Sequence, residues 1–262
     1  MSPKIPKPAT RASILAHYES EARQHGTDAE STIKDPRVRA MEIAAIARHV
    51  KDGDRLLEIG CGNGYAAIEI ARRAAVHIDG FDVTPAMVDL ARRQPRDGLK
   101  GTVEFVLGDI LTFQAPATYD GVYTERALQN LLSWEEQKRA LAGIAAVLKP
   151  GGHYLMLESF LTGLTTLNQA RAELDLPPVE MPWHNQFFDD GAVKAHMADL
   201  GCRLADEDRF LSGYYFGSRV LYPALLPKGK VAVSSSILND YFVGMESRGD
   251  FCPMKMLRFV KS

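Results

Sequence analysis

Short apolar runs alternate along this chain with segments in which apolar residues recur at helical spacing. The apolar runs fall at 56–59, 75–83, 103–107, 119–126 and 153–160. The helical segments are 11–24, 36 to about 53, 66–73, 85–93 and 134–148. Buried strands that alternate with amphipathic helices are typical of an α/β protein with a parallel sheet. We therefore predict a doubly wound α/β fold.

The end of the first strand carries the most informative local pattern. Glu58 precedes three alternate glycines, Gly60, Gly62 and Gly64, and a helix-like stretch begins directly after them. Glycine permits positive φ and close approach of a ligand, and the first turn of a helix offers free N–H groups to an anionic group. The pattern favours a nucleotide-like ligand. The spacing is G-x-G-x-G, which disfavours a nicotinamide oxidoreductase with G-x-G-x-x-G.

This stretch resembles motif I, E/D-x-G-x-G-x-G, of the class I S-adenosylmethionine-dependent methyltransferases. The resemblance implies a Rossmann-like seven-stranded sheet with an antiparallel terminal strand, and S-adenosylmethionine as the cofactor. Later signatures match in order: an acidic residue ends the second strand, Gly108-Asp109-Ile110 follows the third, and Leu148-Lys-Pro-Gly-Gly precedes the fifth. Beyond the core, the chain looks like bacterial methyltransferases of small metabolites or sugars.

The cofactor contacts expected from this resemblance follow the strand ends. Asp82 would accept hydrogen bonds from both ribose hydroxyls, Val83 and Met87 would lie beside the adenine, and Asp109 would accept from its amino group. Arg39 would bind the cofactor carboxylate or else remain a surface residue. The full expected set is Arg39, Glu58, Gly60, Cys61, Gly62, Gly64, Asp82, Val83, Met87, Asp109, Ile110 and Glu125.

Two polar residues at the end of the fourth strand should lie beneath the transferred methyl group. Glu125 could contact the amino group of the cofactor and Arg126 the acceptor, or the two could form an ion pair that only fixes the loop. We keep both interpretations, and we include Glu125 and Arg126 among the candidate catalytic residues.

The pattern divides the chain into a core and inserted segments. We expect a tail and lid helix at 1–31, with a flexible end at 1–10, and a cofactor-binding core at 32–160. A first lid insertion is expected at 161–188, further core at 189–211, and a second lid insertion at 212–250. The last core strand lies in 251–262. The family pattern is thinnest in the two insertions, which we expect to form helical lids and the acceptor site.

Aromatic, basic and amide side chains in these segments are the candidates for acceptor binding, because small-molecule sites combine apolar walls with a few directed polar groups. The candidates are Tyr18, Arg171, Trp183, His184, Asn185, Tyr214, Tyr215, Arg219 and Tyr222. His184 is the candidate base for a hydroxyl acceptor, although it could equally be a clamp or a structural residue. A carboxylate acceptor would need no base and could be held by Arg171 or Arg219.

Composition narrows the class of partner. The 262 residues include 31 basic and 33 acidic ones, a formal net charge of -2, which gives no electrostatic reason to expect nucleic acid or a membrane surface. The three cysteines, Cys61, Cys202 and Cys252, suit neither a disulfide framework nor a metal site. We expect a cytoplasmic monomer or homodimer that binds a small-molecule substrate and no metal.

The function predicted from these observations is methyl transfer from S-adenosylmethionine to a small polar metabolite, at a hydroxyl or carboxylate oxygen. The alternatives are an N-methyltransferase acting on a small amine and a catalytically silent S-adenosylmethionine-binding subunit. Few acidic residues fall near the expected acceptor site, which favours oxygen over an amine.

Overall fold

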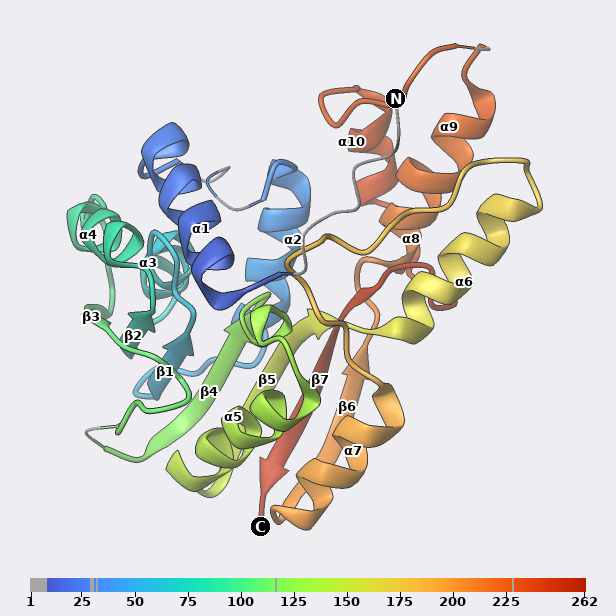
Figure 1. The fold of residues 1–262 in the computed structure, drawn as a ribbon. Coiled ribbons are helices and arrows are strands. Elements are labelled where there is room, and N and C mark those ends of the chain that lie inside the picture. The colour runs from blue at the N-terminus through green and yellow to red at the C-terminus, as the bar shows by residue number, and fades with distance from the viewer. Residues whose placement is uncertain (1–8, 29–30, 32, 116, 228) are drawn as a thin grey trace.

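A computed structural model describes residues 9–28, 31, 33–115, 117–227 and 229–262. Its centre is a seven-stranded sheet of order β3-β2-β1-β4-β5-β7-β6 (Figure 1). The first five strands are parallel, and β7 is antiparallel to both of its neighbours. The strands are β1 (Arg55–Ile59), β2 (His77–Asp82), β3 (Thr102–Leu107), β4 (Tyr119–Glu125), β5 (Leu148–Ser159), β6 (Cys202–Asp208) and β7 (Met254–Lys261). The predicted seven-stranded, Rossmann-like fold is confirmed.

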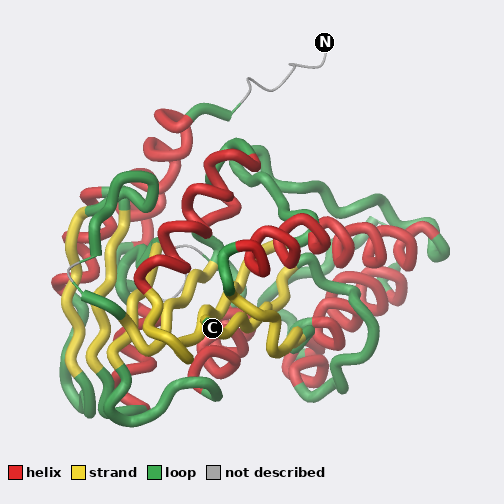
Figure 2. Tube along the Cα trace, turned by 90° about the horizontal axis from the view of Figure 1, so that it is seen from below, coloured by secondary structure: helices red, strands yellow, loops and turns green. Residues whose placement is uncertain are grey.

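Helices cover both faces of the twisted sheet (Figure 2). The core helices are α2 (Pro36–Ala47), α3 (Tyr65–Arg73), α4 (Pro85–Arg93), α5 (Trp134–Val147) and α7 (Asp190–Asp199), and α1 (Arg11–His25) precedes them. Asp35 and Ser133 cap α2 and α5 by accepting hydrogen bonds from backbone N–H groups, and Pro occupies the first position of α2 and α4.

Two expected boundaries are wrong. The helix predicted to continue towards Gly53 ends at Ala47, before a turn that leads into β1. The fifth strand begins at Leu148 rather than His153, because Leu148 pairs with Tyr119 across a bulge in β4. The Lys-Pro-Gly-Gly run is thus a bent start of the strand, with Gly151 at φ 76°.

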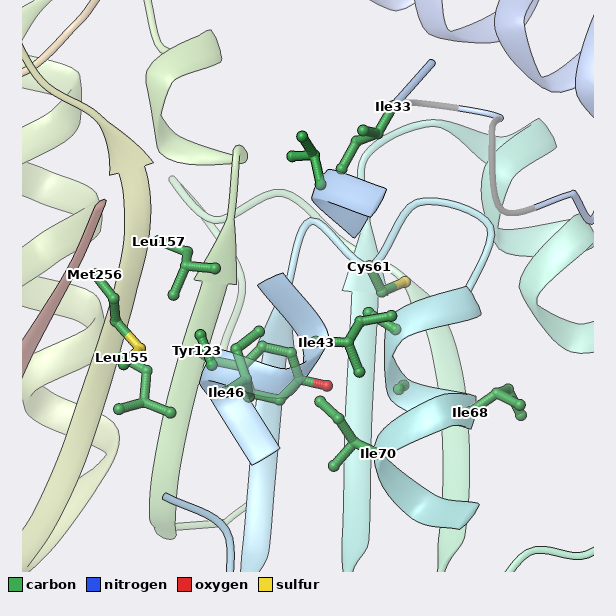
Figure 3. Close-up of a cluster of buried hydrophobic side chains, with 14 of the residues drawn as sticks. Ile33, Ile43, Ile46, Cys61, Ile68, Ile70, Tyr123, Leu155, Leu157 and Met256 are labelled. Atoms are coloured by element: carbon green, nitrogen blue, oxygen red, sulfur yellow. The ribbon is translucent and has the colours of Figure 1, made fainter. Parts of the chain in front are cut away.

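Alternate side chains of the strands enter one of two hydrophobic clusters. Tyr123 and Leu155 pack on one face with Ile43 and Ile46 of α2 and with α3 (Figure 3). Val122, Tyr154 and Met156 pack on the other face with α5 and α7. The period of two in the strands and the apolar faces of the helices therefore account for the layered fold.

The two insertions lie beyond the carboxyl ends of the parallel strands (Figure 1). The first begins with α6 (Leu161–Ala172) and continues as irregular chain. The second contains α8 (Ser212–Tyr215), a π-helix at Phe216–Leu221, α9 (Tyr222–Leu225) and α10 (Leu238–Val243). Tyr214, Tyr222 and Phe242 are buried in the first core cluster, so the second insertion is packed on the core. Residues 1–8 of the expected flexible end, and the expected core boundary at Thr32, lie outside the described residues.

A buried lysine joins the insertions to the sheet. Lys255 of β7 is 1% exposed, and its ammonium contacts carboxylates of Asp190, Glu207 and Asp250. It also donates to Thr162 Oγ1 at 3.2 Å, at the start of α6. A buried ammonium is stable only when surrounding acceptors replace its water. These contacts therefore hold the sheet, the start of α6 and the end of the second insertion together.

The close contact of α6 with the segment just before β7 predicts a stability change. A Cβ at Gly163 would lie 2.0 Å from the carbonyl oxygen of Cys252, whereas a Cβ at Gly143 of α5 would meet nothing within 4 Å. We expect Gly163→Ala to lower the free energy of unfolding by about 1–3 kcal/mol through overpacking. Gly143→Ala should instead raise it by about 0.5–1 kcal/mol, because alanine favours the helix. Urea denaturation of both variants tests this, and equal stability of Gly163→Ala and the parent protein would contradict the packing.

Candidate functional site

A cavity of about 470 Å³ lies at the carboxyl ends of the parallel strands, where open α/β sheets bind ligands. Strand ends and the loops after them form its floor, α1 forms one wall, and residues 182, 184 and 185 of the first insertion form another part. The expected cofactor residues that line it are Arg39, Glu58, Gly60, Cys61, Gly62, Asp82, Val83, Met87, Asp109, Ile110 and Glu125. The cavity lining therefore brings together all but one of the residues predicted to hold the cofactor.

The glycine loop is held in place by the carboxylate at the end of β2. Asp82 accepts hydrogen bonds from the N–H of Gly62 at 3.0 Å and of Thr84 at 2.8 Å. Gly60, Gly62 and Gly64 have φ of 74°, 52° and 77°, values that residues with a side chain rarely adopt. Burial raises the pKa of Asp82, and the backbone N–H groups oppose this rise. The loop and the acidic strand end thus form one unit, suited to a polar ligand such as a ribose.

The carboxylate after β3 meets the first helix across the cavity. Asp109 accepts from Leu111 N–H at 3.1 Å and forms an ion pair with Arg11 of α1. Tyr18, also of α1, donates its hydroxyl hydrogen to Asn130 Oδ1 at 3.3 Å, and burial raises the pKa of Tyr18 to about 12. These two contacts hold α1 over the strand ends.

Two arginines and two glutamates form a buried charge network beside the end of β4. Arg39 donates from Nη1 to Glu125 Oε1 at 3.1 Å, with side-chain exposures of 8% and 5%. Arg126 donates from Nε at 3.0 Å and from Nη2 at 2.5 Å to Glu42 Oε1. The pKa of Glu42 is raised by burial and by the nearby Glu125, while Arg126 opposes the rise. Arg39 is therefore no surface residue, and Glu125 and Arg126 pair with arginine and glutamate partners rather than with each other.

The buried carboxylate of Glu158, on β5, holds the loop that follows β4. Glu158 accepts backbone N–H groups of Ala127 at 3.1 Å, Leu128 at 3.0 Å and Gln129 at 3.1 Å. Burial raises the pKa of Glu158 to about 7 against the effect of these bonds. Arg126, just before them, has φ 58°, a strained value for a side chain of its size. The backbone beside the cavity is therefore determined by side chains from β5.

The far side of the cavity carries unsatisfied polar atoms. Among the described residues, the buried atoms His184 Nδ1 and Asn185 Oδ1 have no hydrogen-bond partner, and both residues line the cavity. The rings of His184 and His17 lie 4.8 Å apart, and Tyr18 is next to them. Burial and the neighbouring His17 lower the pKa of His184, so its imidazole is neutral at pH 7. A ligand with a donor and an acceptor would satisfy these atoms.

Several predicted site residues do not line the cavity. Gly64 caps α3, where an added Cβ would lie 2.8 Å from Ala91 and Phe105. Trp183 is half exposed, and the centroid of its ring lies 5.2 Å from that of His184. The remaining predictions that the lining does not include are Arg171, Tyr214, Tyr215, Arg219 and Tyr222.

Internal partners explain the absence of this last group. Arg171 donates to the carbonyl oxygens of Pro177, at 2.7 Å, and of Arg219. Tyr214 donates to Asp35 Oδ2 at 2.6 Å, beneath the amino end of α2. The expectation that the second insertion forms the acceptor site therefore lacks support from the geometry, because its side chains pack on the core.

The lining also includes residues that the sequence did not single out. Arg11, Ile14, Leu15, His17 and Glu21 come from α1, and others come from 129–132 and 136. His17 and Glu21 follow Ile14 at i+3 and i+7, so the helical face that carries Ile14 and Tyr18 was the available signal. The loop after β4 gave no such signal, because its course depends on Glu158.

Comparison with known proteins agrees with this arrangement. Residues 56–152 match the model of a family described as a methyltransferase domain. An O-methyltransferase, rstn1, of Aspergillus nomiae is 35% identical over 111 residues, 42% of this chain and 48% of that protein. The 27-O-demethylrifamycin SV methyltransferase of Amycolatopsis mediterranei is 31% identical over 154 residues, 57% of this chain and 55% of that protein.

A solved structure shows the same fold over nearly the whole chain. Magnesium protoporphyrin IX methyltransferase of Synechocystis, with bound S-adenosylhomocysteine, superposes with a TM-score of 0.60 at 17% identity, covering 96% of this chain and 98% of that one. The chain spans about half the length of the two curated relatives described above. Since one of them is fungal and the other bacterial, these matches do not single out a bacterial subgroup.

The fold, the glycine loop and the domain match together define a nucleotide-type cofactor site on an α/β sheet. Residues 56–152 are thus a methyltransferase domain, the fold is that of the class I S-adenosylmethionine-dependent methyltransferases, and the cofactor of this domain is S-adenosylmethionine. Within the described residues, no helix is both long and apolar enough to cross a membrane. The three cysteines are free and buried.

The bonds made by Asp82 predict its contribution to cofactor binding. We expect Asp82→Ala to weaken S-adenosylhomocysteine binding by about 1–3 kcal/mol, because charged hydrogen bonds are lost and the Gly62 loop is released. Asp89→Ala is the matched control, since its carboxylate is 64% exposed on α4. Isothermal titration calorimetry measures both, and unchanged affinity of Asp82→Ala would disprove the ribose assignment.

Proposed function

We propose that this protein transfers a methyl group from S-adenosylmethionine to an oxygen atom of a small polar metabolite. The observation that carries the proposal is the neutral imidazole of His184, a residue that lines the cavity shared with the cofactor residues and whose buried Nδ1 lacks a partner within the described chain. An acceptor hydroxyl needs a base of this kind within hydrogen-bond reach. The printed names of two relatives, an O-methyltransferase and a rifamycin methyltransferase, are consistent with it.

The proposed roles divide the cavity into two parts. Glu58, Asp82, Asp109 and the Arg39–Glu125 pair hold the cofactor at the strand ends, while Tyr18, His184 and Asn185 hold the acceptor. When bound, the cofactor supplies an electrophilic methyl group on a sulfonium. The remaining task of the protein is alignment, exclusion of water and removal of the hydroxyl proton.

Proton removal requires that the imidazole be neutral before each turnover. His17 is the nearest titratable neighbour, and a proton on one ring disfavours a proton on the other. Glu21 acts in the opposite direction on His184. We propose that Nδ1 of His184 accepts the acceptor proton as the new carbon–oxygen bond forms.

Two other functions remain distinguishable by experiment. An amine acceptor that bound unprotonated would be methylated without a base, and Glu21 or Glu136 of the lining would then pair with the ammonium that methylation forms. A silent subunit would bind the cofactor without turnover. The unsatisfied polar atoms at 184 and 185 favour an enzyme, because a site that holds no acceptor gains nothing from them.

The first test is release of S-adenosylhomocysteine from pools of sugars, hydroxy acids, carboxylic acids, phenols and amines. We expect turnover with a hydroxyl-containing pool and a loss of about 10²–10⁴-fold in kcat for His184→Ala, the usual contribution of a general base. His196→Ala is the control, because His196 faces α5 and lies outside the cavity lining. Turnover only with amines would refute the oxygen assignment, and none with any pool despite cofactor binding would favour the silent subunit.

The pH dependence follows from the lowered pKa of His184. Because the basic form is already present at pH 7, kcat should be flat from about pH 7 to 8.5 and should fall below the ordinary histidine pKa of ~6.5. The residual activity of His184→Ala should lack this acidic fall. An identical fall in both proteins would show that another group titrates.

A further inference from the structure

A second cavity, of about 450 Å³, lies at the opposite end of the sheet from the cofactor site. The end of α2, the loop before β1, the start of β4, the bent start of β5 and one residue of β7 surround it. It shares no lining residue with the first cavity. Its lining is Arg48, His49, Lys51, Asp54, Asp120, Lys149–His153 and Arg258.

Positive charge exceeds negative charge in this lining, although the whole chain has a formal net charge of -2. The cations are Arg48, Lys51, Lys149 and Arg258, two more than the acids Asp54 and Asp120. Both acids are engaged by groups of the protein. Asp54 accepts the N–H of Lys51 at 2.8 Å, and Asp120 accepts the N–H of Arg55 at 2.9 Å and the Lys149 ammonium at 2.7 Å.

Several polar atoms of residues around the second cavity remain without partners among the residues described. Arg258 Nε and His153 Nε2 are buried atoms that make no hydrogen bond. The Lys51 side chain is exposed and forms no ion pair with the described chain, whereas Arg48 pairs with Asp208 and Lys149 with Asp120. The unpaired polar groups therefore belong to lining residues from three separate elements.

The two histidines respond to this positive surrounding. Burial lowers the pKa of His49, and so do Arg258 and Arg48, while Asp206 and Asp208 of β6 oppose them. Burial also lowers the pKa of His153, with Arg258, Lys51 and His49 acting in the same direction and Asp54 against it. An anion in the cavity would reverse part of this effect, because a nearby negative charge favours the imidazolium form.

We propose that this second cavity binds the phosphate group of a small organic phosphate. Guanidinium and ammonium groups are the usual partners of phosphate, and imidazoles add N–H donors. The cavity volume lies in the range of about 300–1,000 Å³ that is typical for organic ligands, which favours a phosphate ester over the free ion. The site is independent of the cofactor, since no residue is common to the two cavities.

The test is to titrate the full chain with ribose 5-phosphate, with inorganic phosphate and with ribose. Binding is measured by calorimetry and by NMR of the histidine ring protons. We expect saturable binding of ribose 5-phosphate, weaker binding of inorganic phosphate and none of ribose. Lys51→Gln and Arg258→Gln should each weaken the ester at least about tenfold, the order of one charged hydrogen bond. Affinity for S-adenosylhomocysteine should not change in either variant.

Arg73→Gln is the matched control, because Arg73 is an exposed cation on α3 whose side chain forms no hydrogen bond or ion pair within the described chain. If it weakens the ester as much as Lys51→Gln does, the attraction is diffuse and the proposal fails. Equal or tighter binding of inorganic phosphate would identify the free ion as the ligand and overturn the assignment to an ester. Absence of saturable binding by either phosphate would overturn the site itself. If Arg258→Gln unfolds the sheet, Lys51→Gln still tests the proposal, because the Lys51 side chain is exposed.

A second experiment follows the histidine titrations with and without sulfate, an anion whose charge is constant between pH 5 and 8. The titration midpoints of His49 and His153 should rise in its presence, because bound anion and bound proton stabilise each other. The other histidines of the seven in the chain should not shift. Equal shifts in all of them would mean a general salt effect and would count against the site.

Discussion

The carboxylate of Asp82 ties the end of β2 to the glycine loop that follows β1, through the N–H groups of Gly62 and Thr84. This constraint joins the carboxyl ends of the neighbouring parallel strands β2 and β1, next to the point between β1 and β4 where the strand order reverses. The three positive φ values of the loop are tolerable only because the residues are glycines. The cofactor site, its neighbouring strand ends and the position of α3 all depend on that local geometry.

Around this loop, buried charge is arranged in pairs rather than avoided. Arg39 with Glu125 and Arg126 with Glu42 lie under the cavity, and Lys255 gathers three carboxylates between the insertions. Breaking one member of such a pair leaves an uncompensated buried charge, so these contacts specify where each segment sits. These contacts join the insertions to the core, and the second insertion contributes aromatic rings to the core cluster.

Much of this arrangement follows from the sequence, because local rules decide it. The period of the apolar positions predicts the strands and helices, and the glycine spacing with Asp82 and Asp109 predicts where the cofactor residues meet. The acceptor side could not be predicted in the same way. Aromatic and basic residues such as Tyr214 and Arg171 look like site residues in sequence, yet Asp35 and the backbone carbonyl oxygen of Arg219, with which they bond, come from distant segments. The sequence does not identify His17 as a site residue, because only the packing of α1 over the strand ends places it beside His184.

The most direct test of the account is to follow a ¹³C-labelled methyl group from S-adenosylmethionine to the product by NMR and mass spectrometry. The account predicts that the label appears in a methyl ether or methyl ester, and that its appearance requires His184 when the acceptor is a hydroxyl. A label on nitrogen or carbon, or a bound cofactor that never gives up its label to any acceptor pool, would contradict it.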